Sequence, residues 1–84
     1  MGQKTTEPGE ISVQFGKVVA HAMIDAGITT NTQLAEMTGI SGPTIGRILR
    51  GTRVTPVEEA VLIAKALGIP LSKLIAAMEK RLTS

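Results

Sequence analysis

The chain has 84 residues, enough for one small domain with a single core. It has no cysteine and one histidine, which excludes a disulfide framework and a structural zinc site. Hydrophobic residues make up 43% of the chain, one residue is aromatic and the formal net charge is +2, so the composition favours an all-α bundle and excludes a polycation.

The N-terminal segment is polar and the rest of the chain has helical periodicity. Residues 1–10 include Pro8-Gly9 and lack a core-facing pattern, so we expect a flexible arm, with residues 11–84 forming the domain. From Ile11 to Ala26, apolar residues recur at the i, i+3, i+4 spacing of an amphipathic helix. Gly16 inside this helix costs about 1 kcal/mol relative to alanine, and we expect it to mark a close contact with another helix.

Two shorter helices are predicted next, each with its own start signal. Thr30-Asn31-Thr32-Gln33 is a capping box, in which Thr30 and Gln33 satisfy each other's backbone amides at the start of a helix. That helix ends at Gly39. Ser41 is placed to cap the following helix, and Pro43 is tolerated in its first turn because the amide there has no intrahelical partner.

The helix after Ser41 has two distinct faces. At 100° per residue, one face points inward and carries Ile45, Ile48 and Leu49. The other face points outward and carries Arg47 and Arg50, together with Pro43 near its start. We therefore expect the inward face to anchor the helix and the outward face to be available for contacts.

Two more helices complete the predicted bundle. Thr55-Pro56-Val57-Glu58 has the pattern of a second capping box, with proline at the first helical position. The helix that follows ends at Gly68, and Pro70 begins the last one. The apolar stripe of the last helix consists of Leu71, Leu74, Ile75, Met78 and Leu82. Because four helices already serve one core, we expect Met78 and Leu82 at its outer end to face a second copy of the chain.

Residues 31–50 have the layout of a helix-turn-helix. Leu34, Ala35 and Thr38 share one face of the first helix, and Ala35 is small where two helices meeting at a sharp turn come closest. The alternative is an ordinary helical hairpin in a small bundle. The charge pattern supports the first interpretation, because residues 40–55 carry three arginines and no acid while the rest of the chain carries six basic and seven acidic residues. Such a local positive field suits contacts with phosphates.

Residues 12–80 resemble the Cro/cI-type, or lambda-repressor-like, helix-turn-helix family. The resemblance rests on the capped TTNTQLAEMTGIS, the inward Ile45 and Ile48, the closing RGTRVTP, and ALGIPLSKLI at the entry to the last helix. It implies an all-α, five-helix bundle that contains a helix-turn-helix at about residues 31–50. It also implies that Asn31 and Gln33 contact phosphate, and that the early outward residues of the second helix of the motif read bases.

The chain departs from the family pattern at the start of that second helix. Gly42 and Pro43 stand where members of the family commonly carry long hydrogen-bonding side chains. Base reading then rests on Ser41, Thr44 and Arg47, with Arg50 and Arg53 on the DNA backbone. Gly42 and Gly46 would allow a closer approach of the DNA, and Gln3 and Lys4 could add a contact from the arm.

The expected function is a sequence-specific, DNA-binding transcriptional regulator, a phage repressor or Cro-like protein that binds double-stranded operator DNA as a homodimer. We expect it to be cytoplasmic, because no apolar run is long enough to span a bilayer and no signal peptide is visible. No enzymatic activity, cofactor, metal, membrane partner or small-molecule substrate is expected. Two alternatives stay open: an antitoxin-type autorepressor, and a helical protein-interaction module that does not bind DNA.

Overall fold

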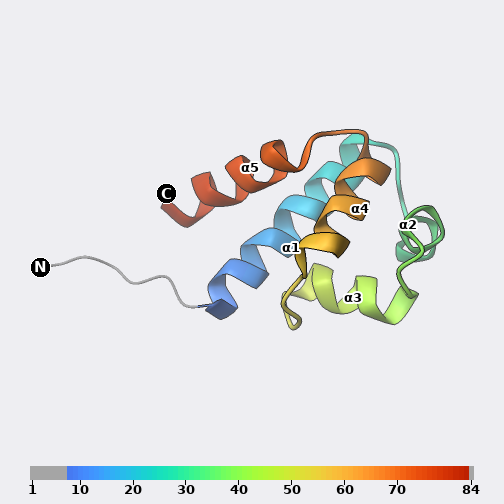
Figure 1. Cartoon of the computed structure of the whole chain (residues 1–84), viewed down its shortest axis with the longest axis horizontal. Coiled ribbons are helices and arrows are strands. Elements are labelled where there is room, and N and C mark those ends of the chain that lie inside the picture. Colours follow the sequence, from blue (N-terminus) through green and yellow to red (C-terminus); the bar gives the residue numbers. More distant parts are fainter. Residues whose placement is uncertain (1–7, 84) are drawn as a thin grey trace, which may run out of the picture.

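The computed structural model describes residues 8–83 and folds them into five α-helices without strands (Figure 1). The helices are α1 (Pro8–Asp25), α2 (Asn31–Thr38), α3 (Gly42–Arg50), α4 (Val57–Leu67) and α5 (Leu71–Thr83). This arrangement confirms the predicted all-α, five-helix fold. No single helix within these residues is long and apolar enough to cross a membrane; α4 and α5 would reach that length and composition only as a pair bent by 105°.

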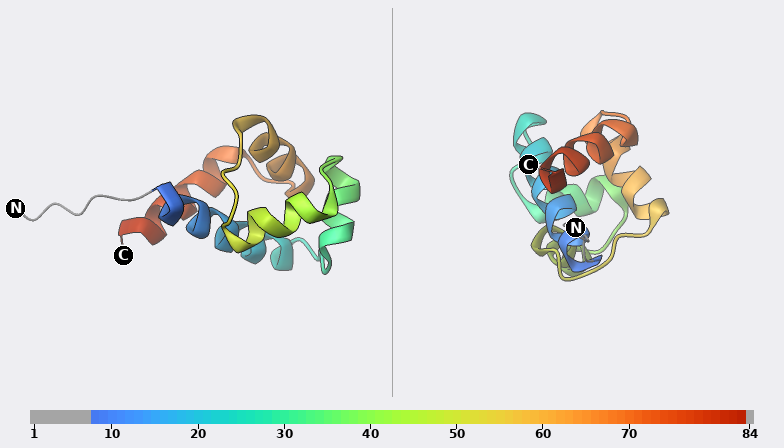
Figure 2. Two further views of the ribbon diagram at one scale, coloured as in Figure 1. Left: turned by 90° about the horizontal axis from the view of Figure 1, so that it is seen from below. Right: turned by 90° about the vertical axis from the view of Figure 1, so that its left-hand side faces the viewer.

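All five helices contribute to one core. Its fully buried large side chains are Val19 from α1, Leu34 from α2, Ile45 and Ile48 from α3, Ile63 from α4 and Leu74 from α5. The central helix is α1, which packs against α3, α4 and α5, whereas α3 and α5 do not touch each other. Both Figure 1 and the right-hand view of Figure 2 show α3 and α5 on opposite sides of α1.

The first helix begins earlier than predicted, within the segment that we expected to be the arm. It starts at Pro8, and Pro8 to Glu10 are helical rather than part of the arm. The physical reason is that proline has its φ fixed near the helical value and lacks only an amide hydrogen that the first turn would leave unpaired anyway. The rest of the predicted arm, including Gln3 and Lys4, lies outside the described residues.

A glycine sets the distance between α1 and α3, as the sequence predicted. A Cβ on Gly16 would lie 2.5 Å from the carbonyl oxygen of Ile48 and 2.6 Å from that of Leu49. At the end of α3, a Cβ on Gly51 would lie 2.5 Å from the Cα of Val13. The backbones of the two helices therefore touch, and α1 serves as the support on which α3 rests.

The start of α4 differs from the predicted capping box. Pro56 is not the first helical residue: its φ of −61° and ψ of 153° are extended, and the helix begins at Val57 with no side-chain cap. Thr55 is thus one residue too far from the first-turn amides to accept a hydrogen bond from them. The start of α5 is close to the prediction, with Pro70 immediately before Leu71.

Candidate DNA-binding surface

The candidate surface consists of the outward side of α3 together with the start of α2. Ile45 and Ile48 hold α3 from within, since neither is more than 1% exposed. Arg47 and Arg50 are exposed on the other side of the same helix. The helix therefore has the predicted polarity, with an apolar anchor beneath and two guanidinium groups above.

The turn between α2 and α3 is fixed by a threonine whose role was not predicted from the sequence. The hydroxyl of Thr38 is buried and donates to the carbonyl oxygen of Leu34 at 2.9 Å. It also accepts from the backbone amide of Ile40 at 3.1 Å, which leads the chain out of the turn. The left-handed Gly39, with φ of 80°, lies between them. The sequence does carry a signal for this role, because Thr38 is the last residue of a predicted helix and directly precedes the glycine that ends it.

At the start of α3, Ser41 and Thr44 are joined to each other. The Ser41 hydroxyl oxygen accepts from the amide of Thr44 at 3.3 Å, which is the predicted N-cap, and its O–H donates to the Thr44 hydroxyl at 2.8 Å. One hydroxyl hydrogen of the pair is thereby used within the protein. The other stays available for an outside acceptor, so the two predicted base-reading residues can act as a joined pair.

At the start of α2, the side-chain amide of Gln33 has a defined orientation. The Oγ1 of Thr30 accepts from the amide of Gln33 at 3.0 Å, as the capping box predicted. The return bond is shifted by one residue, because Oε1 of Gln33 accepts from Thr29 at 3.2 Å rather than from Thr30. This bond turns Oε1 of Gln33 toward Thr29. The Nε2 group of the same side chain, a hydrogen-bond donor, stays available for a phosphate.

Two of the predicted phosphate-binding residues, Arg50 and Asn31, both lie close to Gly46 of α3. The position that a Cβ of Gly46 would occupy lies 3.3 Å from Nη1 of Arg50 and 3.8 Å from Nδ2 of Asn31. Arg50 therefore folds back over the preceding turn of its own helix toward the start of α2. The expected approach of DNA to the backbone of Gly46 does not fit this arrangement, because Gly46 is buried beneath these side chains; Gly42 has open space around it.

Arg53 is less available than its place in the sequence suggested. Its Nη2 forms an ion pair with Oε2 of Glu59 at 2.8 Å, with side chains that are 33% and 23% exposed. Nε of Arg53 and Oε1 of Glu59 are buried without a hydrogen-bond partner, so the pair is joined at one point only. The charge of Arg53 is compensated, and the local positive field rests mainly on Arg47 and Arg50.

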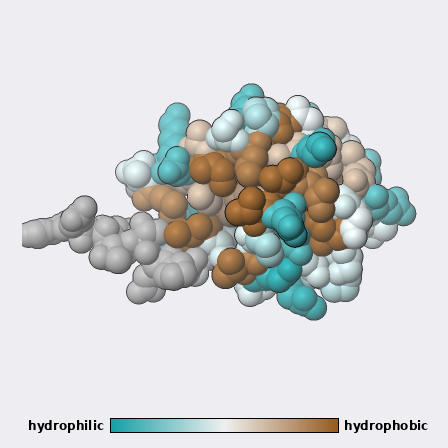
Figure 3. Space-filling view, in the orientation of Figure 1, coloured by the Kyte–Doolittle hydropathy of each residue, from teal (hydrophilic) through white to brown (hydrophobic). Residues whose placement is uncertain are grey.

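The two residues predicted to form a dimer contact are only partly available. Met78 is half-buried and packs against the hydrophobic core of its own chain. Leu82, one turn further, is half-buried near the end of α5. Apolar side chains with a larger exposed fraction lie on α4, where Val57 is 73%, Val61 40% and Leu62 43% exposed. In Figure 3, apolar residues gather over α4 on the face toward the viewer.

Comparison with known families agrees with this geometry. The sequence model of a family described as helix-turn-helix matches residues 22–74, from the second half of α1 to the first turn of α5. No curated protein matches the chain. Within residues 8–83, no group of three or more His, Asp or Glu side chains is arranged to hold a metal ion.

Proposed function

Because this chain belongs to the Cro/cI-type helix-turn-helix family of DNA-binding transcription regulators, we propose that it is a repressor or Cro-like protein of the phage type, which binds operator DNA as a dimer. The observation that carries this proposal is the outward side of α3. Thr44 and Arg47 lie one turn apart on the outward face of α3. Arg50 and Asn31 lie close by, near Gly46. We place the protein in the cytoplasm and assign it no enzymatic activity.

Within this proposal, α3 enters the major groove and its outward side chains read sequence. Arg47 is exposed and can bond bidentately to guanine, while the joined hydroxyls of Ser41 and Thr44 offer one hydrogen to a base acceptor. Ser41 and Thr44 act here as a joined pair rather than as two separate readers of bases.

The phosphate contacts fall to side chains on both helices of the motif. Arg50 and Asn31 would clamp one phosphate from above Gly46, and Nε2 of Gln33 would bind a neighbouring one. The free amides at the start of α2 add a favourable dipole. Arg53 contributes less, because Glu59 already compensates its charge.

For the dimer, we propose that two copies meet through the exposed side of α4. Val57 and Val61 are one turn apart on this helix and remain uncovered in the single chain. The end of α5, with Met78 and Leu82, is the second candidate surface. A symmetric pair would place two α3 helices about one turn of DNA apart, roughly 34 Å.

The test is selection from a random duplex library, followed by anisotropy titrations of the selected site at several salt concentrations. We expect a palindromic site and an affinity that falls steeply with salt, by roughly 0.9 logarithmic units per tenfold salt increase for each phosphate neutralised. Absence of binding to any duplex at low salt would refute the proposal and leave a protein-interaction module as the function.

A further inference from the structure

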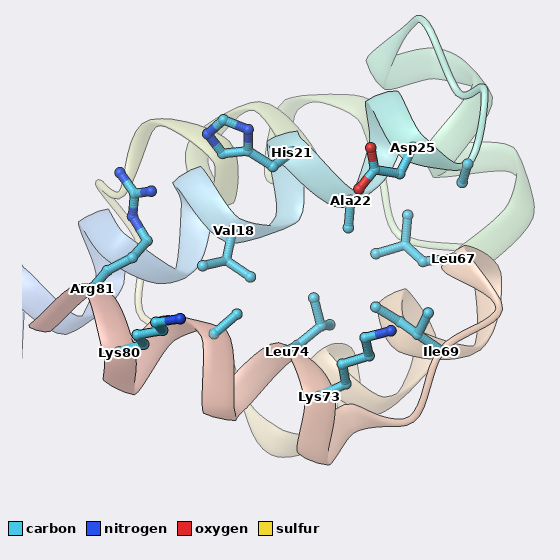
Figure 4. Close-up of a pocket in the computed structure, with 12 residues that line it drawn as sticks. Val18, His21, Ala22, Asp25, Leu67, Ile69, Lys73, Leu74, Lys80 and Arg81 are labelled. Atoms are coloured by element: carbon cyan, nitrogen blue, oxygen red, sulfur yellow. The ribbon is translucent and has the colours of Figure 1, made fainter.

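An open groove lies between α1 and α5, on the side of α1 that faces away from α3 (Figure 4). It has a volume of about 610 Å³, within the range of roughly 300–1,000 Å³ that is usual for binding pockets. Its floor is apolar and consists of Val18, Ala22, Leu67, Ile69, Leu74 and Ala77. Nothing in the DNA-binding proposal uses this surface.

The groove exists because small side chains face each other across it. Ala22 on α1, Ala26 in the turn directly after α1 and Ala77 on α5 line it. Protein interiors usually interdigitate large and small side chains until no such space remains. Leucine in place of these alanines would fill the hollow with side chains that α1 and α5 could share, so the alanines keep it open.

Two lysines lie over this apolar floor. Lys73 and Lys80 are seven residues apart on α5, which corresponds to two helical turns, or about 10.5 Å. In Figure 4 both ammonium groups extend from α5 over the space toward α1. Among residues 8–83, neither lysine takes part in an ion pair. Arg81 also lines the groove, but its Nε donates to Oε1 of Gln14 at 2.8 Å. The carboxylate of Asp25 lines the groove from the α1 side, so a ligand would meet the two lysines along α5 and one anion on α1.

We propose that this groove binds an amphipathic α-helix of a partner protein. The apolar residues of that helix would fill the floor, and acidic residues two turns apart on its flank would pair with Lys73 and Lys80. The two lysines favour this occupant, because its acidic flank can lie along α5 while Asp25 stands on the α1 side of the groove. The two cations stand at opposite ends of the floor, whereas an amphiphile with a single anionic head would satisfy only one of them.

Binding in the groove is independent of the proposed DNA contact. Since α3 and α5 lie on opposite sides of α1 and do not touch, a helix in the groove and a duplex on α3 can be bound together. The proposal therefore stands or fails separately from the DNA-binding function.

The experiment uses three fluorescent peptides of about 18 residues, long enough to form helix in solution. The first carries leucine at i, i+3, i+4 and i+7 with glutamate at two positions seven apart. The second carries lysine in place of the glutamates, and the third has the composition of the first in an order that breaks the periodicity. We expect the first to bind the full chain at least about tenfold more tightly than the others, and to bind equally well when duplex DNA is present.

Two double variants test the site. Ala22→Leu with Ala77→Leu fills the groove and should abolish binding, whereas Ala76→Leu, at an exposed position of α5 outside the groove, should not. Lys73→Glu with Lys80→Glu should reverse the preference in favour of the lysine peptide, whereas Lys65→Glu on α4 should leave it unchanged. The charge variants alter only exposed residues, so they remain informative if the filled variant fails to fold.

Three results would overturn the proposal. The first is equal binding of all three peptides, or of none. The second is retention of the glutamate preference in the charge-reversed variant. The third is binding of dodecanoate, tested as a small anionic amphiphile, in the absence of any peptide binding, which would assign the groove to a small ligand instead.

Discussion

The contact between α1 and α3 at Gly16 makes a single methyl group a sensitive probe of the fold. A Cβ contact is ordinary at 3.4–4 Å, so the 2.5 Å approach to the carbonyl oxygen of Ile48 is about 0.9 Å too close. The obstacle is backbone on both sides and cannot turn away as the end of a side chain could. Gly16→Ala must therefore push α3 off α1.

The net effect combines two opposing contributions. Overpacking costs about 1–3 kcal/mol, and contact with two carbonyl groups places Gly16→Ala at the upper end of that range. Alanine regains up to about 1 kcal/mol from its better helix propensity. We expect the free energy of unfolding to fall by about 2 kcal/mol, and the melting temperature by roughly 8–16 °C for a domain of this size.

The assay is urea and thermal unfolding followed by circular dichroism, with Gly9→Ala as the matched control. Gly9 lies in the same helix, and a Cβ there meets nothing within 4 Å, so that variant should be as stable as the parent or slightly more stable. DNA affinity measured well below the melting temperature should fall for Gly16→Ala and not for Gly9→Ala. If both variants were equally stable, the close approach of α1 and α3 would be refuted.

Three further predictions concern side chains of the motif. Arg47→Ala should cost about 1–3 kcal/mol on the selected operator and little on random DNA; equal losses on both would remove Arg47 from the residues that read bases. Thr38→Val keeps the shape but leaves the buried amide of Ile40 without an acceptor, so unfolding should become easier by about 1–3 kcal/mol, and an unchanged urea midpoint would contradict the role of this hydroxyl. Arg53→Met and Glu59→Gln in a double-mutant cycle should show a coupling of up to about 1 kcal/mol that weakens with salt; no coupling would mean that the pair does not hold the loop to α4.

Local signals in the sequence predicted the elements well. The caps at Thr30 and Ser41 depend on residues three positions apart, and such short-range hydrogen bonds are legible in a single sequence. The contact at Gly16 was also predictable, because a glycine inside a helix that is otherwise favourable needs a packing reason. The prediction of a capping box at Thr55 was wrong. The same four residues allow the helix to begin at Pro56 or at Val57, and only the backbone conformation of Pro56 distinguishes the two.

The arrangement of the side chains on the surface was harder to predict. An arginine looks like a free cation in a sequence, yet Arg53 finds Glu59 six residues later across a loop. Similarly, Arg50 covers Gly46, which the sequence suggested would be open to DNA. The groove beside Lys73 and Lys80 depends on which alanines of α1 and α5 face each other, and this follows from helix packing rather than from periodicity.

The central position of α1 also affects how the chain folds as it is synthesised. This helix is made first, but α5, which covers one of its sides, is made last, and the bond between Gln14 and Arg81 joins residues at opposite ends of the domain. Roughly 60 residues separate the end of α1 from the end of α5, so at about 5–20 residues per second the ribosome leaves that side uncovered for roughly 3–12 s. During this interval Val18 and the apolar residues beside it lack the side chains of α5 that cover them in the folded domain. Completion of the domain is thus a late event, after translation of the last helix.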